Sequence, residues 1–84
     1  MKLITIRRRD GVHTVIMALW EQSGLTQTAL AERSGVHIST LQHMKTSRRE
    51  IGVEVLMKLL DVLGGRLVIA VPDETGAKLG RRLR

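Results

Sequence analysis

Two short apolar repeats on either side of one glycine constrain this chain more than any other feature. Along residues 25–44 the apolar side chains recur at helical spacing, at Leu25, Ala29, Leu30, Val36, Leu41 and Met44. Two helices of about two turns each can share one core only if the chain reverses between them. Gly35 stands at that reversal, and without a Cβ it adopts the left-handed conformation that ends a helix at no steric cost. The segment therefore predicts two short helices joined by a tight turn.

Similar periodicity predicts further helices on both sides of this pair. The predicted helices cover residues 11–23, 27–33, 37 or 38 to 45, and 53–63. Asp10 is expected to cap the first helix and Gly24 to end it, while the hydroxyl of Thr26 is expected to cap the second. The buried side of the last helix should consist of Val53, Leu56, Leu59, Leu60 and Leu63.

Two other segments are predicted to be β-strands. Residues 2–7 are rich in β-branched residues and too short for a core helix. Residues 66–71 follow two glycines and end at Pro72, and their continuous apolar run suggests burial on both faces. Because a two-stranded ribbon is marginal alone, we expect this strand to pair with its copy in a second subunit, with the N-terminal strands as candidates for the outer edges. The predicted dimer interface consists of Leu67, Val68, Ile69, Ala70 and Val71.

Length and composition bound the class of protein. A chain of 84 residues makes one small domain, which we place at residues 1–72, followed by a flexible basic tail at residues 73–84. The sequence contains no cysteine, so a reducing cytoplasm is the expected location. No apolar run reaches the length of a membrane span, and the first residues do not resemble a signal peptide.

The charge balance favours a polyanionic partner. Fourteen Lys and Arg against eight Asp and Glu leave a formal charge of +6 on a small surface. Trp20 is the only aromatic residue, which argues against modules that stack on the bases of single strands or RNA loops. Double-stranded DNA is therefore the expected nucleic acid.

Five short sequence matches, all in ungapped register, resemble the phage-repressor type of helix-turn-helix, the XRE or lambda-repressor-like family. They are Leu25-Thr26-Gln27, Leu30-Ala31, Gly35-Val36, Ser39-Thr40-Leu41 and Val53-Glu54-Val55-Leu56. The resemblance extends over about residues 12–63. With the predicted strands, it implies a mainly α bundle of four to five short helices with a C-terminal strand, and a possible N-terminal strand, used in dimerisation.

The resemblance also implies a DNA-binding surface. The third helix of such a domain lies in the major groove, with its first residues against the base edges, while the second crosses the phosphate backbone. The base-facing positions would be His37, Ile38, Ser39, Gln42 and His43, with Thr40 nearby. The phosphate-facing positions would be Gln27 and its neighbour Thr28, followed by Lys45, Arg48 and Arg49. Alternatively, Ser39 only caps the helix, Ile38 docks against a partner, and Gln27 is an ordinary surface residue.

The chain departs from the family pattern at three positions. Where the family usually has a glutamate this chain has Lys45, and where it often has an arginine this chain has Trp20, so both members of a structural ion pair are replaced. A contact between the Lys45 ammonium and the indole face is one way to compensate. Ser47 stands in place of a usual glycine, so the following loop is the region where the resemblance is least informative.

These features predict a non-enzymatic transcriptional repressor that binds a palindromic operator as a homodimer. The three histidines are dispersed and no acid and base are paired, so neither a metal site nor a catalytic site is expected, and no cofactor. The C-terminal strand resembles the HipB-like antitoxin branch, which implies autorepression and a toxin partner. The alternative is a protein-interaction adaptor, or a toxin-neutralising subunit, without specific DNA binding.

Overall fold

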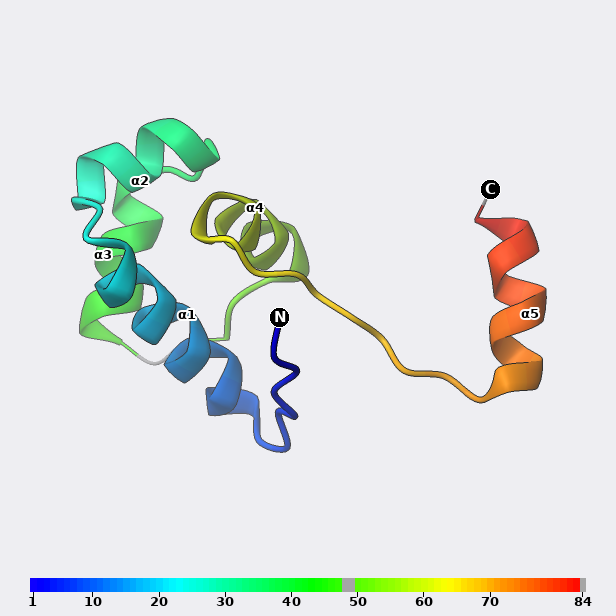
Figure 1. The fold of residues 1–84 in the computed structure, drawn as a ribbon. Coiled ribbons are helices and arrows are strands. Elements are labelled where there is room, and N and C mark those ends of the chain that lie inside the picture. Colours follow the sequence, from blue (N-terminus) through cyan, green and yellow to red (C-terminus); the bar gives the residue numbers. More distant parts are fainter. Residues whose placement is uncertain (48–49, 84) are drawn as a thin grey trace.

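Five helices make up the regular structure of this chain (Figure 1). The computed structural model describes residues 1–47 and 50–83. The helices are α1 (Arg9–Ser23), α2 (Gln27–Ser34), α3 (Ile38–Thr46), α4 (Val53–Leu63) and α5 (Asp73–Arg82). The mainly α prediction is thus confirmed, four of the five helices lie where they were predicted, and the predicted bounds of α2, α3 and α4 agree to within one residue.

The caps around α2 form as the sequence predicts. Thr26 Oγ1 accepts a hydrogen bond from the backbone N–H of Ala29 at 3.1 Å, which satisfies one of the unpaired donors of the first turn. Gly35 ends the helix with φ 76°, and its N–H donates to the carbonyl of Ala31 at 3.0 Å. These two residues fix where α2 begins and where the chain turns into α3.

The predicted start of α1 is wrong by two residues. The N-cap is Arg8, whose side chain makes no capping hydrogen bond, and Asp10 lies inside the first turn. A carboxylate in that turn still interacts favourably with the positive end of the helix dipole. Asp10 therefore favours the helix without forming the predicted cap.

The core lies between the first four helices. One fully buried aliphatic side chain comes from each of them, namely Ile16, Leu30, Leu41 and Leu59. Around these pack the buried residues Trp20, Val36, Met44, Leu56 and Leu60. The prediction that Val53 is buried is wrong, because this first residue of α4 is 62% exposed.

Neither predicted strand is present in residues 1–47 and 50–83. Residues 66–71 instead form an extended segment that leaves the helical body (Figure 1). The predicted burial of both faces is wrong for the single chain, since Val68 is 62% and Ile69 76% exposed. Residues 2–7 are also irregular and exposed. The physical reason is that a strand needs a partner edge, and the described chain offers none to either segment.

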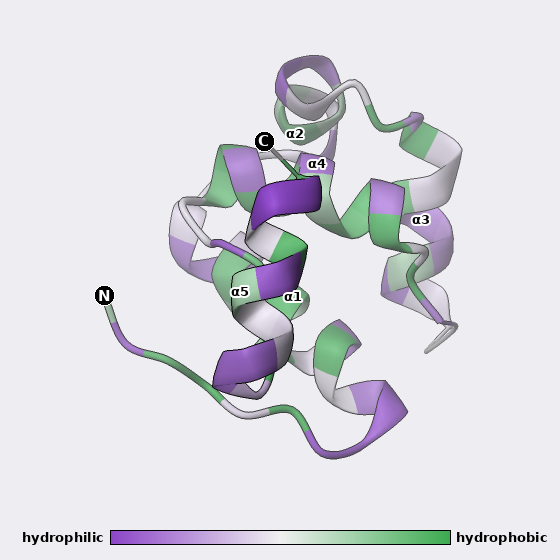
Figure 2. Cartoon of the chain, turned by 90° about the vertical axis from the view of Figure 1, so that its right-hand side faces the viewer, coloured by the Kyte–Doolittle hydropathy of each residue, from purple (hydrophilic) through white to green (hydrophobic). Residues whose placement is uncertain are grey.

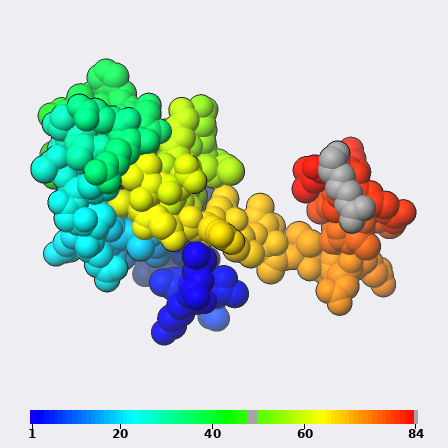
Figure 3. All heavy atoms as spheres, turned by 45° about the horizontal axis from the view of Figure 1, so that its top comes forward, coloured from blue at the N-terminus to red at the C-terminus, as the bar shows by residue number. Residues whose placement is uncertain are grey.

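Residues 73–82 of the predicted tail form the helix α5. Its first turn is acidic, with Asp73 and Glu74, and its last turn is basic, with Arg81 and Arg82, so both ends match the helix dipole. None of its residues is buried, and it stands apart from the other four helices (Figures 1 and 3). Among the residues that the structure describes, no helix is both long and apolar enough to cross a bilayer.

Candidate nucleic-acid interface

Helix α3 has one buried face and one exposed face. Leu41 and Met44 point into the core, where α3 packs against α2. Gln42, His43 and Lys45 are exposed, as is Ser39 one turn earlier. The packing of α3 therefore fixes a row of polar side chains on the outside of the domain.

The first turn of α3 is closed by a histidine. His37 is the N-cap, and its Nδ1 accepts a hydrogen bond from the backbone N–H of Ser39 at 3.1 Å. The hydroxyl of Ser39 lies 2.7 Å from the same nitrogen. His37 therefore caps the helix, the role that was considered for Ser39. Ile38, between these two residues, is 38% exposed, and Thr40 is half-buried.

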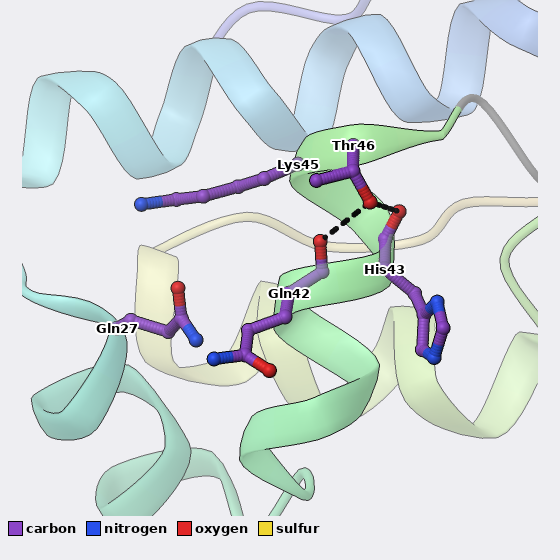
Figure 4. A pocket seen from close by; sticks show the side chains of 5 residues that line it. All are labelled: Gln27, Gln42, His43, Lys45 and Thr46. Atoms are coloured by element: carbon purple, nitrogen blue, oxygen red, sulfur yellow. Dashed lines mark hydrogen bonds between the residues drawn. The ribbon is translucent and has the colours of Figure 1, made fainter.

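A hollow of about 450 Å³ lies between the start of α2 and the exposed face of α3 (Figure 4). It is lined by Gln27, Gln42, His43, Lys45 and Thr46. The side-chain amides of Gln27 and Gln42 point toward each other, and the Lys45 side chain extends along one edge. The hydroxyl of Thr46 is held by the carbonyls of its own helix, at 3.1 Å from Gln42 O and 3.4 Å from His43 O. The amides of Gln27 and Gln42 and the ammonium of Lys45 therefore bring hydrogen-bond donors to this hollow.

The predicted contact between Lys45 and Trp20 is confirmed. Lys45 Nζ lies 4.6 Å from the centroid of the Trp20 ring, within the range of a cation–π interaction. Trp20 is only 4% exposed, and its Nε1–H donates to the carbonyl of Leu25 at 2.9 Å. One indole thus joins α1 to the turn before α2 and holds the side chain of Lys45 beside the hollow.

A second link between α1 and α3 was not predicted. Nε2 of His13 lies 2.6 Å from the carbonyl oxygen of Met44 in the last turn of α3. A carbonyl can only accept, so Nε2 carries the proton and donates. His13 is buried, and it precedes Ile16 by three and Trp20 by seven residues, the spacing of one helix face. That spacing was the available signal that His13 faces the core.

The opposite flank of α3 borders the segment that leads into α4. A smaller hollow there, of about 170 Å³, is lined by Thr40, His43, Met44, Glu50, Ile51, Gly52 and Val55. Arg9 Nη1 lies 3.2 Å from Glu50 Oε1, so the start of α1 reaches this flank. The predicted phosphate contacts Arg48 and Arg49 lie outside the described residues. Thr28, the remaining predicted contact, is exposed in the first turn of α2.

Comparison with known proteins gives one match. A sequence model described as helix-turn-helix matches residues 16–69, which span α1 from Ile16 through α4 and into the extended segment. Neither the curated proteins nor the solved structures contain a match. The matched residues cover more than half of the chain and include the turn at Gly35 and the whole of α3. The chain therefore belongs to the XRE-type helix-turn-helix family of DNA-binding regulators.

Proposed function

We propose that this protein is a sequence-specific transcriptional repressor that binds a palindromic operator in duplex DNA as a homodimer. The observation that carries the proposal is the exposed face of α3, which presents Ser39, Gln42 and His43 beside the donors of the Gln27 hollow. An α-helix with its side chains is about 10–12 Å across, close to the width of the major groove. Helix α3 therefore has the size and the exposure needed to enter the groove.

The side chains at this face have the chemistry of base readout. The amide of Gln42 can make a bidentate contact to adenine, and the exposed Ile38 can pack against a thymine methyl group. Ser39 and His43 both carry hydrogen-bonding groups. Because His37 already caps the helix, Ser39 is not needed for that role.

The neighbouring donors fit a phosphate contact. Gln27 is the first residue of α2, where free backbone N–H groups and the helix dipole favour an anion. The Lys45 ammonium adds a full positive charge at the edge of the same hollow. Such contacts position a protein on DNA without reading its sequence, so base specificity rests on α3.

The exposed segment Leu67–Val71 supports the homodimer. Its side chains are apolar and its backbone is extended, which makes it an unpaired edge for another chain. Pairing with the same segment of a second copy would bury both segments at once and relate the two α3 helices by a twofold axis. A palindromic site with half-sites about 34 Å apart suits such a dimer. We propose that the protein acts in the cytoplasm.

Selection of binding sites from a random duplex pool, at two salt concentrations, tests this function. We expect a single palindromic sequence to be enriched, with an affinity that falls steeply as salt rises. The matched control is the variant Gln42→Ala, which should lose preference at one position of each half-site while phosphate binding persists. Weak binding without sequence preference would instead favour the adaptor function.

One observation favours a second candidate function, that of an autorepressing antitoxin. Helix α5 has no buried residue and stands apart from the DNA-binding helices, so it is available to a protein partner while DNA is bound. Co-expression with the product of the adjacent gene tests this role. Rescue of growth by the full chain, but not by a chain that ends at Pro72, is the expected result.

A further inference from the structure

The N-terminal segment is anchored on the first turn of α1. A methyl group added at Gly11 would lie 2.8 Å from Cγ2 of Ile6, so the Ile6 side chain packs directly on this glycine. Nε of Arg8 lies 3.9 Å from Oδ1 of Asp10. These contacts hold Arg7, Arg8 and Arg9 together at the start of α1, before the residues that the family model matches.

The start of α1 is in turn held beside the end of α3. The ion pair of Arg9 with Glu50 connects it to the segment after α3, and the hydrogen bond from His13 to Met44 connects the next turn. In Figure 2 the chain is hydrophilic where it enters α1, at the lower edge of the molecule. Arg9, which directly follows Arg7 and Arg8 in the chain, is therefore held next to the segment after α3.

The two flanks of α3 carry different polar groups. Gln27 and Lys45 line the hollow on one flank, whereas Glu50 lines the hollow on the other. A helix that fills the major groove turns one flank toward each of the two DNA strands. Arg9 stands on the Glu50 flank, with Arg7 and Arg8 directly before it in the chain, and this is the flank that Gln27 does not line.

The charges on this flank are available to an anion. Arg8 and Arg9 pair with carboxylates on the surface, with side chains 86% and 89% exposed, and such pairs are weak. Arg7 makes no ion pair with any residue in the described part of the chain. An exposed guanidinium of this kind can leave its hydrated carboxylate and bind a phosphate instead. Its planar fork of N–H groups makes charge-assisted, bidentate hydrogen bonds to phosphate oxygens.

We propose that Arg7, Arg8 and Arg9 form a second phosphate-binding surface, which contacts the DNA strand opposite the one that faces Gln27. This proposal rests on the proposed function, because it needs α3 in the major groove. The domain then contacts the phosphates of both DNA strands that border the major groove, one strand through α2 and the other through the start of α1. The surface adds affinity and no sequence preference.

The salt dependence of DNA binding tests this surface. The full-length variant Arg7→Ala/Arg8→Ala is compared with Arg81→Ala/Arg82→Ala, which removes the same charge from the exposed end of α5. Each lost phosphate contact lowers the slope of log K against log salt by about 0.9, so the first variant should lose about 1 to 2 units of slope. Its affinity at about 0.1 M salt should fall by roughly one to two orders of magnitude. The α5 variant should keep both values.

The outcomes distinguish a failure of the second phosphate-binding surface from a failure of the proposed function. Equal slopes for the unmodified protein and the Arg7/Arg8 variant would overturn the second phosphate-binding surface alone. An equal loss in both variants would overturn it too, because net charge would then explain the effect. If the unmodified protein binds no preferred duplex, the proposed function itself is wrong. Thermal melting followed by circular dichroism confirms that both variants keep the helical fold.

Discussion

The side chains of Trp20 and His13 in α1 both contact the end of α3. Trp20 contacts the ammonium of Lys45 and bonds the carbonyl of Leu25, while His13 bonds the carbonyl of Met44. Lys45 and Met44 are consecutive in the last turns of α3, so both contacts hold the same stretch of that helix. The orientation of α3 thus depends on side chains that need never touch DNA.

The contact between Trp20 and Lys45 should contribute a measurable coupling to stability. In a double-mutant cycle with Trp20→Leu and Lys45→Met, we expect a coupling of about 0.5–1 kcal/mol in the free energy of unfolding. The lost Nε1 hydrogen bond is common to two corners of the cycle and cancels. A parallel cycle with Lys58→Met, whose ammonium pairs with Glu54 on α4, should give no coupling. Equal coupling in the two cycles would contradict a specific cation–π contact.

His13→Leu should destabilise the fold through its polar contact and not through lost volume. Leucine fills a similar space but leaves the Met44 carbonyl without its donor, which costs about 1–3 kcal/mol in the free energy of unfolding. Thr14→Ala is the neighbouring control, because that exposed hydroxyl only bonds a carbonyl of its own helix. Denaturant unfolding measures both. A His13→Leu variant as stable as Thr14→Ala would show that the hydrogen bond contributes nothing net.

Among the elements, those set by local chemistry could be predicted and those set by distant contacts could not. Thr26 and Gly35 act within a few residues of themselves, so the bounds of α2 follow from the sequence. The link from His13 to Met44 spans 31 residues and needed the structure. The strand at residues 66–71 was predicted from residue types alone, although pairing depends on a neighbouring edge. Helix α5 was missed because its glycines suggested a flexible tail, whereas its charged ends favour a helix.

The turn between α2 and α3 should not tolerate a side chain at Gly35. Its φ of 76° costs an L-residue about 1–2 kcal/mol, so Gly35→Ala should lower the free energy of unfolding by that amount. Gly80→Ala is the control in which the same substitution should not destabilise the fold. Gly80 lies within α5, where an added Cβ meets nothing within 4 Å. That variant should raise the helical content of α5. Denaturant titration and circular dichroism distinguish the two, and unchanged stability in Gly35→Ala would contradict the turn geometry.

The whole molecule consists of a packed four-helix body and an outlying helix at the end of an extended segment (Figures 1 and 3). The body contains every buried residue among those described. The extended segment instead carries exposed leucine, valine and isoleucine side chains. Burial of this segment against a second copy, as proposed above, would add apolar contacts to a small body.

Removing one backbone donor from this segment should separate the proposed dimer. Val68→Pro eliminates an N–H that a strand ladder would use, while Val68→Ala shortens the side chain and keeps that N–H. We expect the proline variant to sediment as a monomer at concentrations where the alanine variant remains a dimer, with the helical content of both unchanged. A dimeric proline variant would place the interface elsewhere.

The ring of Trp20 has a consequence for how this protein can be observed. The sequence has one tryptophan and no tyrosine, so the near-ultraviolet fluorescence of the entire chain comes from a single indole. A cation stands 4.6 Å from that ring, on the side chain that borders the Gln27 hollow. Any anion that draws the ammonium away alters the electric field at the fluorophore and shifts its emission. The unlabelled protein therefore contains its own optical probe, located where a DNA backbone would arrive.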